Sequence, residues 1–189
     1  MVRHDLPSGR VCNFMSAEGK KRMQEKAGVI VSVVMGSDSD LPVMEEAVKV
    51  LEAFAVPHEL FLTSAHRTPE RTAAFCRGAS KRGVRVIIVG AGAAAHLAGV
   101  IASQTLLPVI GVPIDATSLQ GLDALLATVQ MPGGIPVATM AIGKAGAKNA
   151  ALLAIRILAL EDAGLLKKLQ SFVRKMVQEV ERKHENLKK

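Results

Sequence analysis

The stretch GVIVSVVMG, residues 28–36, is a continuous apolar run rich in β-branched side chains, which is typical of a strand covered on both faces. The stretch DLPVMEEAVKVLEAFA, residues 40–55, follows it and predicts a helix. Asp40 is placed to cap this helix, and Pro42 suits its first turn. Four apolar residues fall on one face of the helix: Met44, Val48, Leu51 and Ala55. A buried strand that leads directly into an amphipathic helix is the repeating unit of a parallel α/β sheet.

The same strand-to-helix pattern recurs four times further along the chain. The expected strands are residues 58–64, 84–91, 107–114 and 135–143. The expected helical segments are residues 69–82, 92–104, 119–130 and 145–161. Five strands that alternate with helices predict an α/β fold with three αβα layers around a central five-stranded parallel sheet, flavodoxin-like or Rossmann-like. Ligands of such sheets bind in the loops beyond the carboxyl ends of the strands.

The chain divides into three parts. Residues 1–27 lack a clean periodicity and predict a mobile N-terminal extension. Residues 28–160 hold the strand and helix pattern and predict the catalytic α/β domain. Residues 161–189 predict a C-terminal helix, with an apolar stripe over residues 165–182. Because no strand accompanies this helix, the stripe could cover its own sheet or pack on a neighbouring subunit.

Charge and composition exclude several classes of protein. The formal net charge is +7, but residues 28–160 hold ten Lys or Arg against nine Asp or Glu. With no Trp or Tyr to stack on bases, a nucleic-acid partner is not expected. Cys12 and Cys76 lie far apart without metal-type spacing, which favours a reducing cytoplasm over a disulfide scaffold or a zinc site. No apolar run reaches the roughly 18–20 residues of a membrane span, so a membrane partner is not expected either.

The stretch GSDSD, residues 36–40, follows the first expected strand. Its glycine permits a tight turn, and its hydroxyls and the helix N-terminus behind them can bind a phosphate. Its carboxylates could take ribose hydroxyls instead. The same residues are also ordinary helix caps, so binding and capping stay open as alternatives. The stretch is neither a Walker A nor a GxGxxG motif.

The stretch TSAHRTPER, residues 63–71, follows the second expected strand. His66 can transfer protons near neutral pH, and Arg67 can hold an anion through paired N–H groups. In the alternative interpretation, Ser64 or Thr68 caps the next helix, and the side chains of His66 and Arg67 are solvated.

The stretch GAGAAAHLAG, residues 90–99, follows the third expected strand. Its small residues let a ligand approach the backbone closely. His96 in this stretch is either part of the site or a buried, hydrogen-bonded core histidine. No His, Cys and carboxylate set is spaced for a metal, and no GxSxG or nucleotide-triphosphate loop is present. We therefore expect chemistry that uses one histidine, hydroxyls and backbone amides, without metal or cofactor.

Five stretches together closely resemble one protein family: VVMGSDSDLPVM (33–44), TSAHRTPER (63–71), VIIVGAGAAAHLAG (86–99), LPVIGVP (107–113) and VQMPGGIPVATMAIGKAGAKNAALLA (129–154). The family is the class I N5-carboxyaminoimidazole ribonucleotide mutase, or PurE, of purine biosynthesis, and the resemblance covers residues 29–160. It implies a cofactor-independent isomerase that moves a carboxyl group from the exocyclic nitrogen of the ribonucleotide substrate to ring carbon C4. The product would be 4-carboxy-5-aminoimidazole ribonucleotide. The resemblance also implies a homo-octamer in which neighbouring chains complete each site.

Carried over residue by residue, the resemblance makes His66 the general acid–base. His66 would protonate the departing nitrogen and later remove the C4 proton. The resemblance implies these substrate-binding residues: Ser37, Ser39, Asp40, Ser64, Ala65, Arg67, Gly90, Gly92, His96 and Leu97.

Two positions depart from the family pattern GGAAHLPGM. Ala93 replaces a glycine and Ala98 replaces a proline. If Ala93 takes a positive φ, the loop is strained by about 1 kcal/mol or more. The roles of Lys144 and Lys148, at the start of a helix, stay open between anion binding and solvent.

Two other functions compete with the mutase. The class II aminoimidazole ribonucleotide carboxylase uses free carbon dioxide, but it typically has Lys after the histidine and lacks the AAH signature. Arg67 and His96 therefore favour the mutase. The second alternative is a non-catalytic phosphosugar-binding or flavin-binding module, which the fold alone would permit. A flavin module would usually offer Tyr or Trp, and this chain has neither.

Overall fold

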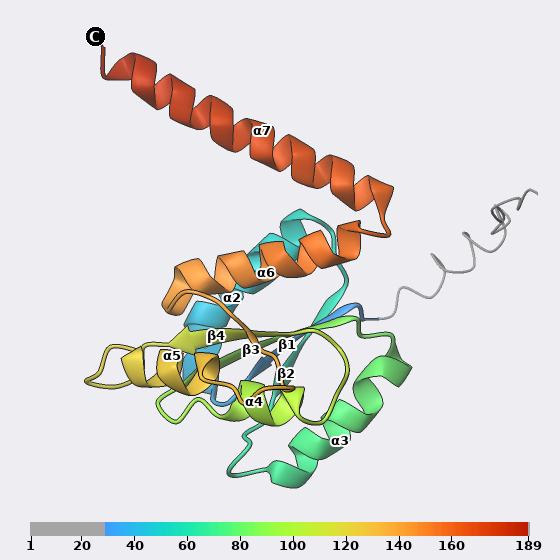
Figure 1. Ribbon diagram of the computed structural model, residues 1–189. Helices are drawn as coiled ribbons and strands as arrows, with labels where there is room; N and C mark the ends of the chain where they lie inside the picture. The colour runs from blue at the N-terminus through green and yellow to red at the C-terminus, as the bar shows by residue number, and fades with distance from the viewer. Residues whose placement is uncertain (1–28, 189) are drawn as a thin grey trace, which may run out of the picture.

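Five parallel strands form the centre of the computed structural model, which describes residues 29–188 (Figure 1). The strands are β1 (Val31–Met35), β2 (His58–Leu62), β3 (Val86–Gly92), β4 (Val109–Ile114) and β5 (Ala138–Thr139). Their order in the sheet is β2-β1-β3-β4-β5, and every neighbouring pair is parallel. This is the flavodoxin-like order, so the predicted fold class is confirmed. The expected extension, residues 1–27, lies outside the described residues.

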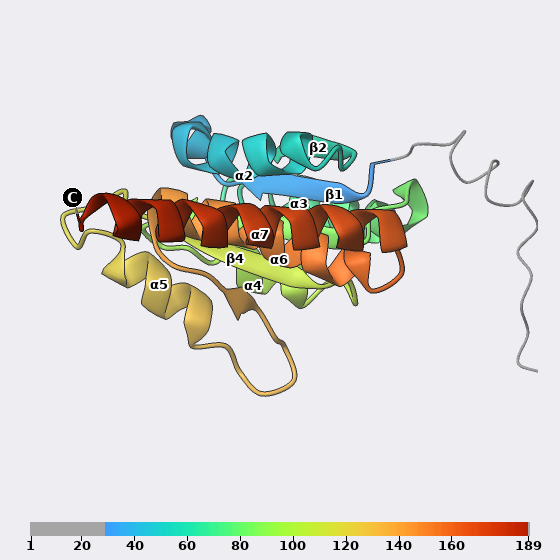
Figure 2. The ribbon, with the colours of Figure 1, turned by 90° about the horizontal axis from the view of Figure 1, so that it is seen from above.

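Helices cover both faces of the sheet (Figures 1 and 2). One face packs against α2 (Leu41–Ala53) and α6 (Gly143–Ala159). The other face packs against α3 (Pro69–Ala79), α4 (Leu97–Ala102) and α5 (Leu122–Val129). Two short 3₁₀ turns, η1 (Asp38–Asp40) and η2 (Ser80–Arg82), complete these connections.

Strand β1, an interior strand of the sheet, is buried along its whole length. Val33 faces the core shared with α2 and α6, whereas Val34 faces the core shared with α3 and α4. The period-2 alternation of a strand sends consecutive side chains into opposite cores, so every position must be compatible with burial. On α6, four alanines in contact with the core are completely buried: Ala147, Ala150, Ala151 and Ala154.

The strand register brings the loops of the sheet to one level. Met35, at the end of β1, is level with Leu62 of β2 and with Gly90 of β3. β3 then continues two residues further beside β4, where Gly92 is level with Ile114. The loops that follow these four strands therefore leave the sheet at the same edge.

Two expected elements are shortened most in the structure. The fifth strand spans only Ala138–Thr139 instead of residues 135–143, because it is an edge strand that follows Pro136, which has no N–H to donate. The helical segment expected over residues 92–104 is reduced to α4, because Ala93 has a φ of 50° and interrupts the helical backbone.

Helix α2 ends two residues before the predicted boundary, so the expected position of Ala55 on its apolar face is wrong. Ala55 has a φ of 55° and is exposed. Its N–H bonds the carbonyl of Glu52 at 2.8 Å, and the N–H of Val56 bonds the carbonyl of Leu51 at 2.9 Å. This pair of bonds is a Schellman motif, with Ala55 at the left-handed position that usually carries glycine.

Helix α7 (Ala163–Asn186) is attached to the body at its N-terminal end. Asp162 caps it by accepting N–H groups from Gly164 and Leu165. Leu165 and Leu169 are buried, and the ring of Phe172 meets Phe54 edge-on at 5.6 Å.

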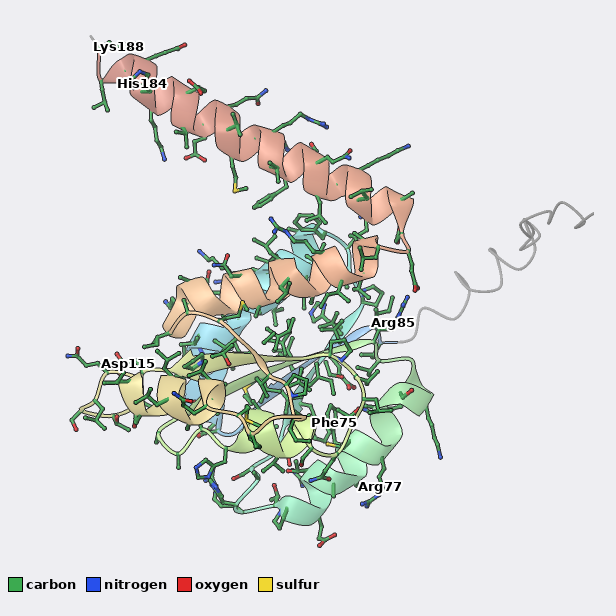
Figure 3. All side chains as sticks on the ribbon, viewed as in Figure 1. Phe75, Arg77, Arg85, Asp115, His184 and Lys188 are labelled. Carbon is green, nitrogen blue, oxygen red and sulfur yellow. The ribbon has the colours of Figure 1, made fainter. Side chains whose placement is uncertain are left out.

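The rest of α7 diverges from α6, and the labelled His184 and Lys188 lie far from the sheet (Figures 1 and 3). Four apolar residues of this part are exposed: Val173, Met176, Val177 and Val180. The predicted stripe therefore has two parts, one that covers its own core and one that is uncovered in the single chain. No helix within residues 29–188 combines the length and apolarity needed to cross a membrane.

Candidate active site

A cavity of about 330 Å³ opens at the carboxyl edge of the sheet. The strand order reverses at β1, and the crevice beyond the ends of β1 and β3 is the usual ligand site in this fold. Its volume lies in the range of small-ligand pockets. The loops after four strands supply its lining: Gly36, Ser37, Ser39, Asp40, Ser64, Ala65, His66, Arg67, Ala91, Gly92, Ala93, Ala94, Leu97 and Ala116.

The GSDSD stretch folds into a turn that is stabilised by its own side chains. The Oγ of Ser37 accepts the N–H of Ser39 at 3.4 Å, and Oδ2 of Asp40 accepts the N–H of Ser37 at 3.0 Å. These reciprocal bonds form a capping box around η1. The predicted side-chain cap of α2 by Asp40 is therefore wrong, because the carboxylate makes no cap bond to α2. Ser37 and Asp40 both cap the turn and line the cavity. Capping and ligand binding, which the sequence left open as alternatives, are therefore compatible.

Asp40 is the buried carboxylate of the cavity, with only 4% of its surface exposed. Burial raises the pKa of Asp40 above that of an ordinary aspartate, and the backbone N–H of Ser37 opposes this shift in part. When ionised, the carboxylate retains lone pairs that the turn does not use. It can therefore accept hydrogen bonds from ligand hydroxyls.

Arg67 connects the loop after β2 to the end of β1. Its Nη2 donates to the carbonyl of Gly36 at 2.9 Å, and its backbone N–H donates to Oγ of Ser64 at 3.2 Å. A guanidinium carries five N–H donors, so most of them stay available to a ligand. The cation and the Ser37 turn together form a site with the chemistry to bind a phosphate.

His66 and His96 come from different loops and share a hydrogen bond. Nε2 of His66 lies 2.9 Å from Nδ1 of His96, and the ring planes are nearly perpendicular, at 84°. Such a bond needs one proton between the two nitrogens, so one ring donates and the other accepts. Both side chains are exposed, which excludes the alternative that His96 is a buried core histidine.

The structure places the two predicted glycines differently. Gly92 lines the cavity, and a Cβ there would collide with Ala116 and approach the carbonyl of Ile114. Gly90 does not line it, because it lies lower in β3, where a Cβ would meet the side chain of Met44. Gly90 is therefore explained by packing of the sheet against α2.

The remaining predicted residues also have clear positions. Ser39, Ser64, Ala65 and Leu97 line the cavity, whereas His96 reaches it through its bond to His66. Five lining residues were not among the predicted substrate-binding residues: Gly36, Ala91, Ala93, Ala94 and Ala116. Their side chains carry no polar group, so only their small size and their places at the ends of β1, β3 and β4 could have indicated them.

Neither lysine left open by the sequence lines the cavity. Nζ of Lys148 lies 3.2 Å from a carboxylate oxygen of Glu46 on α2. Within residues 29–188, no three His, Cys, Asp or Glu side chains gather as a metal site would require.

The chain belongs to the AIR carboxylase family, whose model matches residues 30–179. An N5-carboxyaminoimidazole ribonucleotide mutase of Pyrococcus horikoshii is 56% identical over 158 residues, which is 84% of this chain and 88% of that protein. The corresponding mutase of Thermotoga maritima is 50% identical over 83% of this chain and 91% of its own length. A phosphoribosylaminoimidazole carboxylase of Saccharomyces cerevisiae is 49% identical over 88% of this chain, but the match covers only 29% of that protein.

Solved structures agree with the family assignment. The crystal structure of Treponema denticola PurE superposes with a TM-score of 0.76 at 28% identity, over 85% of this chain and 99% of that chain. A second Treponema denticola structure, PurE2-S38D, gives a TM-score of 0.78 at 26% identity, over 86% and 99% of the two chains.

The left-handed backbone of Ala93 leads to a stability prediction. Replacing Ala93 with Gly relieves about 1–2 kcal/mol of steric strain and adds chain entropy to the unfolded state, so we expect a net gain of about 0.5–1 kcal/mol. The free energy of unfolding, measured in urea, tests this gain. Ala55→Gly is the matched control, because Ala55 has a similar φ of 55° and does not line the cavity. A gain at residue 55 without one at residue 93 would mean that Ala93 is not strained.

The burial of Asp40 leads to a pH-dependent prediction. Because its pKa is raised in the folded protein, the folded chain binds this proton more tightly, and wild-type stability falls as pH rises through the raised pKa. We expect Asp40→Asn to be more stable than wild type at pH 7, with a smaller advantage at acidic pH. Urea unfolding at both pH values tests this, with Glu52→Gln as control, because Glu52 is exposed. An advantage that does not shrink on acidification contradicts the prediction.

Proposed function

We propose that the protein is an N5-carboxyaminoimidazole ribonucleotide mutase of purine biosynthesis, which transfers a carboxyl group from the exocyclic nitrogen to C4. One observation carries the proposal: His66, hydrogen-bonded to His96, lies beside Arg67 at the mouth of the cavity at the carboxyl edge of the sheet. A proton-transfer group next to a phosphate-binding cation fits a reaction on the base of a ribonucleotide. The mutases among its relatives support the same activity.

The polar residues give the nucleotide an orientation. Its phosphate binds between the guanidinium of Arg67 and the hydroxyls of Ser37 and Ser39, which lie 2.9 Å from each other. Its ribose hydroxyls donate to the buried carboxylate of Asp40. The base then lies toward His66 and the loop after β3.

His66 transfers a proton twice, first as an acid and then as a base. As the bond between the exocyclic nitrogen and the carboxyl carbon breaks, carbon dioxide leaves and His66 gives a proton to the nitrogen. C4 then attacks carbon dioxide, and His66 removes the C4 proton, which restores its starting state. His96 accepts the Nε2–H of protonated His66 through Nδ1, which leaves the Nδ1–H of His66 to face the substrate.

The apolar part of the cavity lining suits an uncharged intermediate. It is formed by small and apolar side chains: Ala91, Gly92, Ala93, Ala94, Leu97 and Ala116. Carbon dioxide that is held against such a wall stays close to C4 and away from bulk water.

The direct carboxylase is the second candidate, because relatives with that name match at 47–50% identity. This chain corresponds to nearly the whole length of the mutases but to less than a third of the carboxylases. The Arg67 and His96 positions also favour the mutase.

An octamer and a cytoplasmic location belong to the same proposal. Two separate apolar surfaces are exposed: one on and beside α5, with Leu119, Leu122, Leu126 and Val129, and one on the outer part of α7. A single self-complementary surface closes a dimer, whereas two surfaces allow a larger closed assembly. The separation of the two cysteines in the sequence supports the location.

The first experiment is turnover of freshly generated N5-carboxyaminoimidazole ribonucleotide without ATP or metal, in bicarbonate-depleted buffer. We expect His66→Asn to lose at least about 100-fold in kcat, the usual contribution of a general acid–base. The control is His58→Asn, because His58 bonds the carbonyl of Val56 and does not line the cavity.

Aminoimidazole ribonucleotide with bicarbonate is the parallel substrate. Turnover of this pair alone would assign the protein to the carboxylases. Turnover of neither substrate by wild type would contradict both enzymes and leave a binding module. Retained activity of His66→Asn would contradict the role of His66 only.

Light scattering after size-exclusion chromatography tests the octamer. We expect a mass of about 160 kDa, eight times the chain mass of 20.0 kDa. Val177→Glu, which places a charge on the outer apolar surface of α7, should lower this mass, whereas Gln170→Glu should not. A wild-type mass of one chain would contradict the assembly.

A further inference from the structure

Thr68 occupies the residue before α3, where a threonine ordinarily caps the helix with its hydroxyl. Here its side chain makes no cap bond to α3, and its backbone angles are φ −136° and ψ 55°. The following Pro69 restricts the backbone of Thr68, but this restriction does not decide where the hydroxyl points. The hydroxyl is turned back toward the loop that carries His66 and Arg67.

The hydroxyl of Thr68 closes that loop onto Ser64. Oγ1 of Thr68 accepts the N–H of Ser64 at 2.9 Å and donates to the carbonyl of Ser64 at 3.1 Å. The backbone N–H of Thr68 donates to the same carbonyl at 2.9 Å. Three hydrogen bonds thus join the two ends of the turn, and Ala65, His66 and Arg67 lie between them.

A buried chain of hydroxyls supports this closure. Oγ1 of Thr63 lies 2.9 Å from that of Thr72 and 3.1 Å from that of Thr68. Because each hydroxyl has one proton, the bond of Thr68 to the Ser64 carbonyl requires Thr63 to donate to Thr68. Thr72, on α3, can then donate its proton to Oγ1 of Thr63 or to the carbonyl of Thr68 at 3.2 Å, so the network connects α3 with the residue after β2 and with the turn.

The other hydrogen bonds of the turn, from Arg67 to Ser64 and Gly36 and between His66 and His96, all involve the two residues that the turn must position. The side chains of His66 and Arg67 are exposed, so the turn is not fixed by apolar packing around them. Thr68 does not line the 330 Å³ cavity, so it acts only through its neighbours. A displacement of about 1 Å in a catalytic group can cost on the order of 100-fold in rate.

We propose that the Thr68 hydroxyl is a positioning group, which holds the Ser64–Thr68 turn so that His66 and Arg67 face the substrate. The proposal rests on the functions proposed above for these two residues. It gives the threonine a role in geometry in place of the helix cap that its position would favour.

The test compares Thr68→Val with Thr72→Val in the turnover assay. Each variant loses one hydroxyl of the same network, but only the first loses the bonds to Ser64. We expect Thr68→Val to lower kcat and raise KM, with kcat/KM reduced at least about 10-fold. Thr68→Ser, which keeps the hydroxyl, should restore kcat/KM to within about threefold of wild type, and Thr72→Val should stay within the same limit.

KM separates positioning from stability. If Thr68→Val only reduced the folded fraction, kcat would fall while KM stayed constant, and that result would overturn the proposal. Equal losses in Thr68→Val and Thr72→Val, or no loss in either, would also overturn it. Should Thr68→Val not fold, Thr68→Ala provides the same comparison. Turnover of neither substrate by wild type would instead contradict the proposed function, so the two failures are distinguishable.

Discussion

The parallel register of β1 with β2 and β3 is the constraint on which the site depends. Met35, Leu62 and Gly90 lie at one level, so the three following loops must leave the sheet side by side. The order of the strands then reverses at β1 and leaves a crevice between the connections. Residues far apart in the sequence meet there because backbone hydrogen bonds of the sheet fix their height, not because they attract one another.

Local hydrogen bonds fix the positions of the functional groups at this shared edge. The Ser37 turn uses its own side chains as caps, Arg67 bonds the carbonyl at the end of β1, and Thr68 closes the turn that carries His66. Each of these groups both organises the backbone and leaves a functional group free at the cavity. The site is therefore largely formed before a ligand binds, which lowers the entropy cost of binding.

The same site contains features that oppose stability. Ala93 has a left-handed backbone, and Asp40 carries a carboxyl group in a buried position. Strain and buried charge of this kind are tolerated where the surrounding structure fixes them, and here the rigid sheet and the helices on both faces do so. The outer part of α7 exposes apolar side chains to water, which is unfavourable, and this surface stabilises the protein only when a partner covers it.

The sequence by itself determined the class of fold and the edge where the chemistry lies. Apolar runs such as GVIVSVVMG are typical of strands buried on both faces, and the alternation with helices leaves few topologies. His66, Arg67 and Ser37 could be identified because each follows such a strand. The local departures at Ala55 and in the short fifth strand were not predicted, since hydrogen bonds at a helix end and at a sheet edge override propensity.

Only the tertiary structure decided how the loops meet. The bond between His66 and His96, the burial of Asp40 and the location of Gly90 beneath Met44 all depend on distances between elements that are remote in the chain. The direction of the Thr68 hydroxyl is also of this kind, because a threonine before a helix can bond either the first N–H groups of that helix or the turn before it. Here the hydroxyl bonds Ser64 and the buried Thr63. The linear sequence contains no signal for that choice.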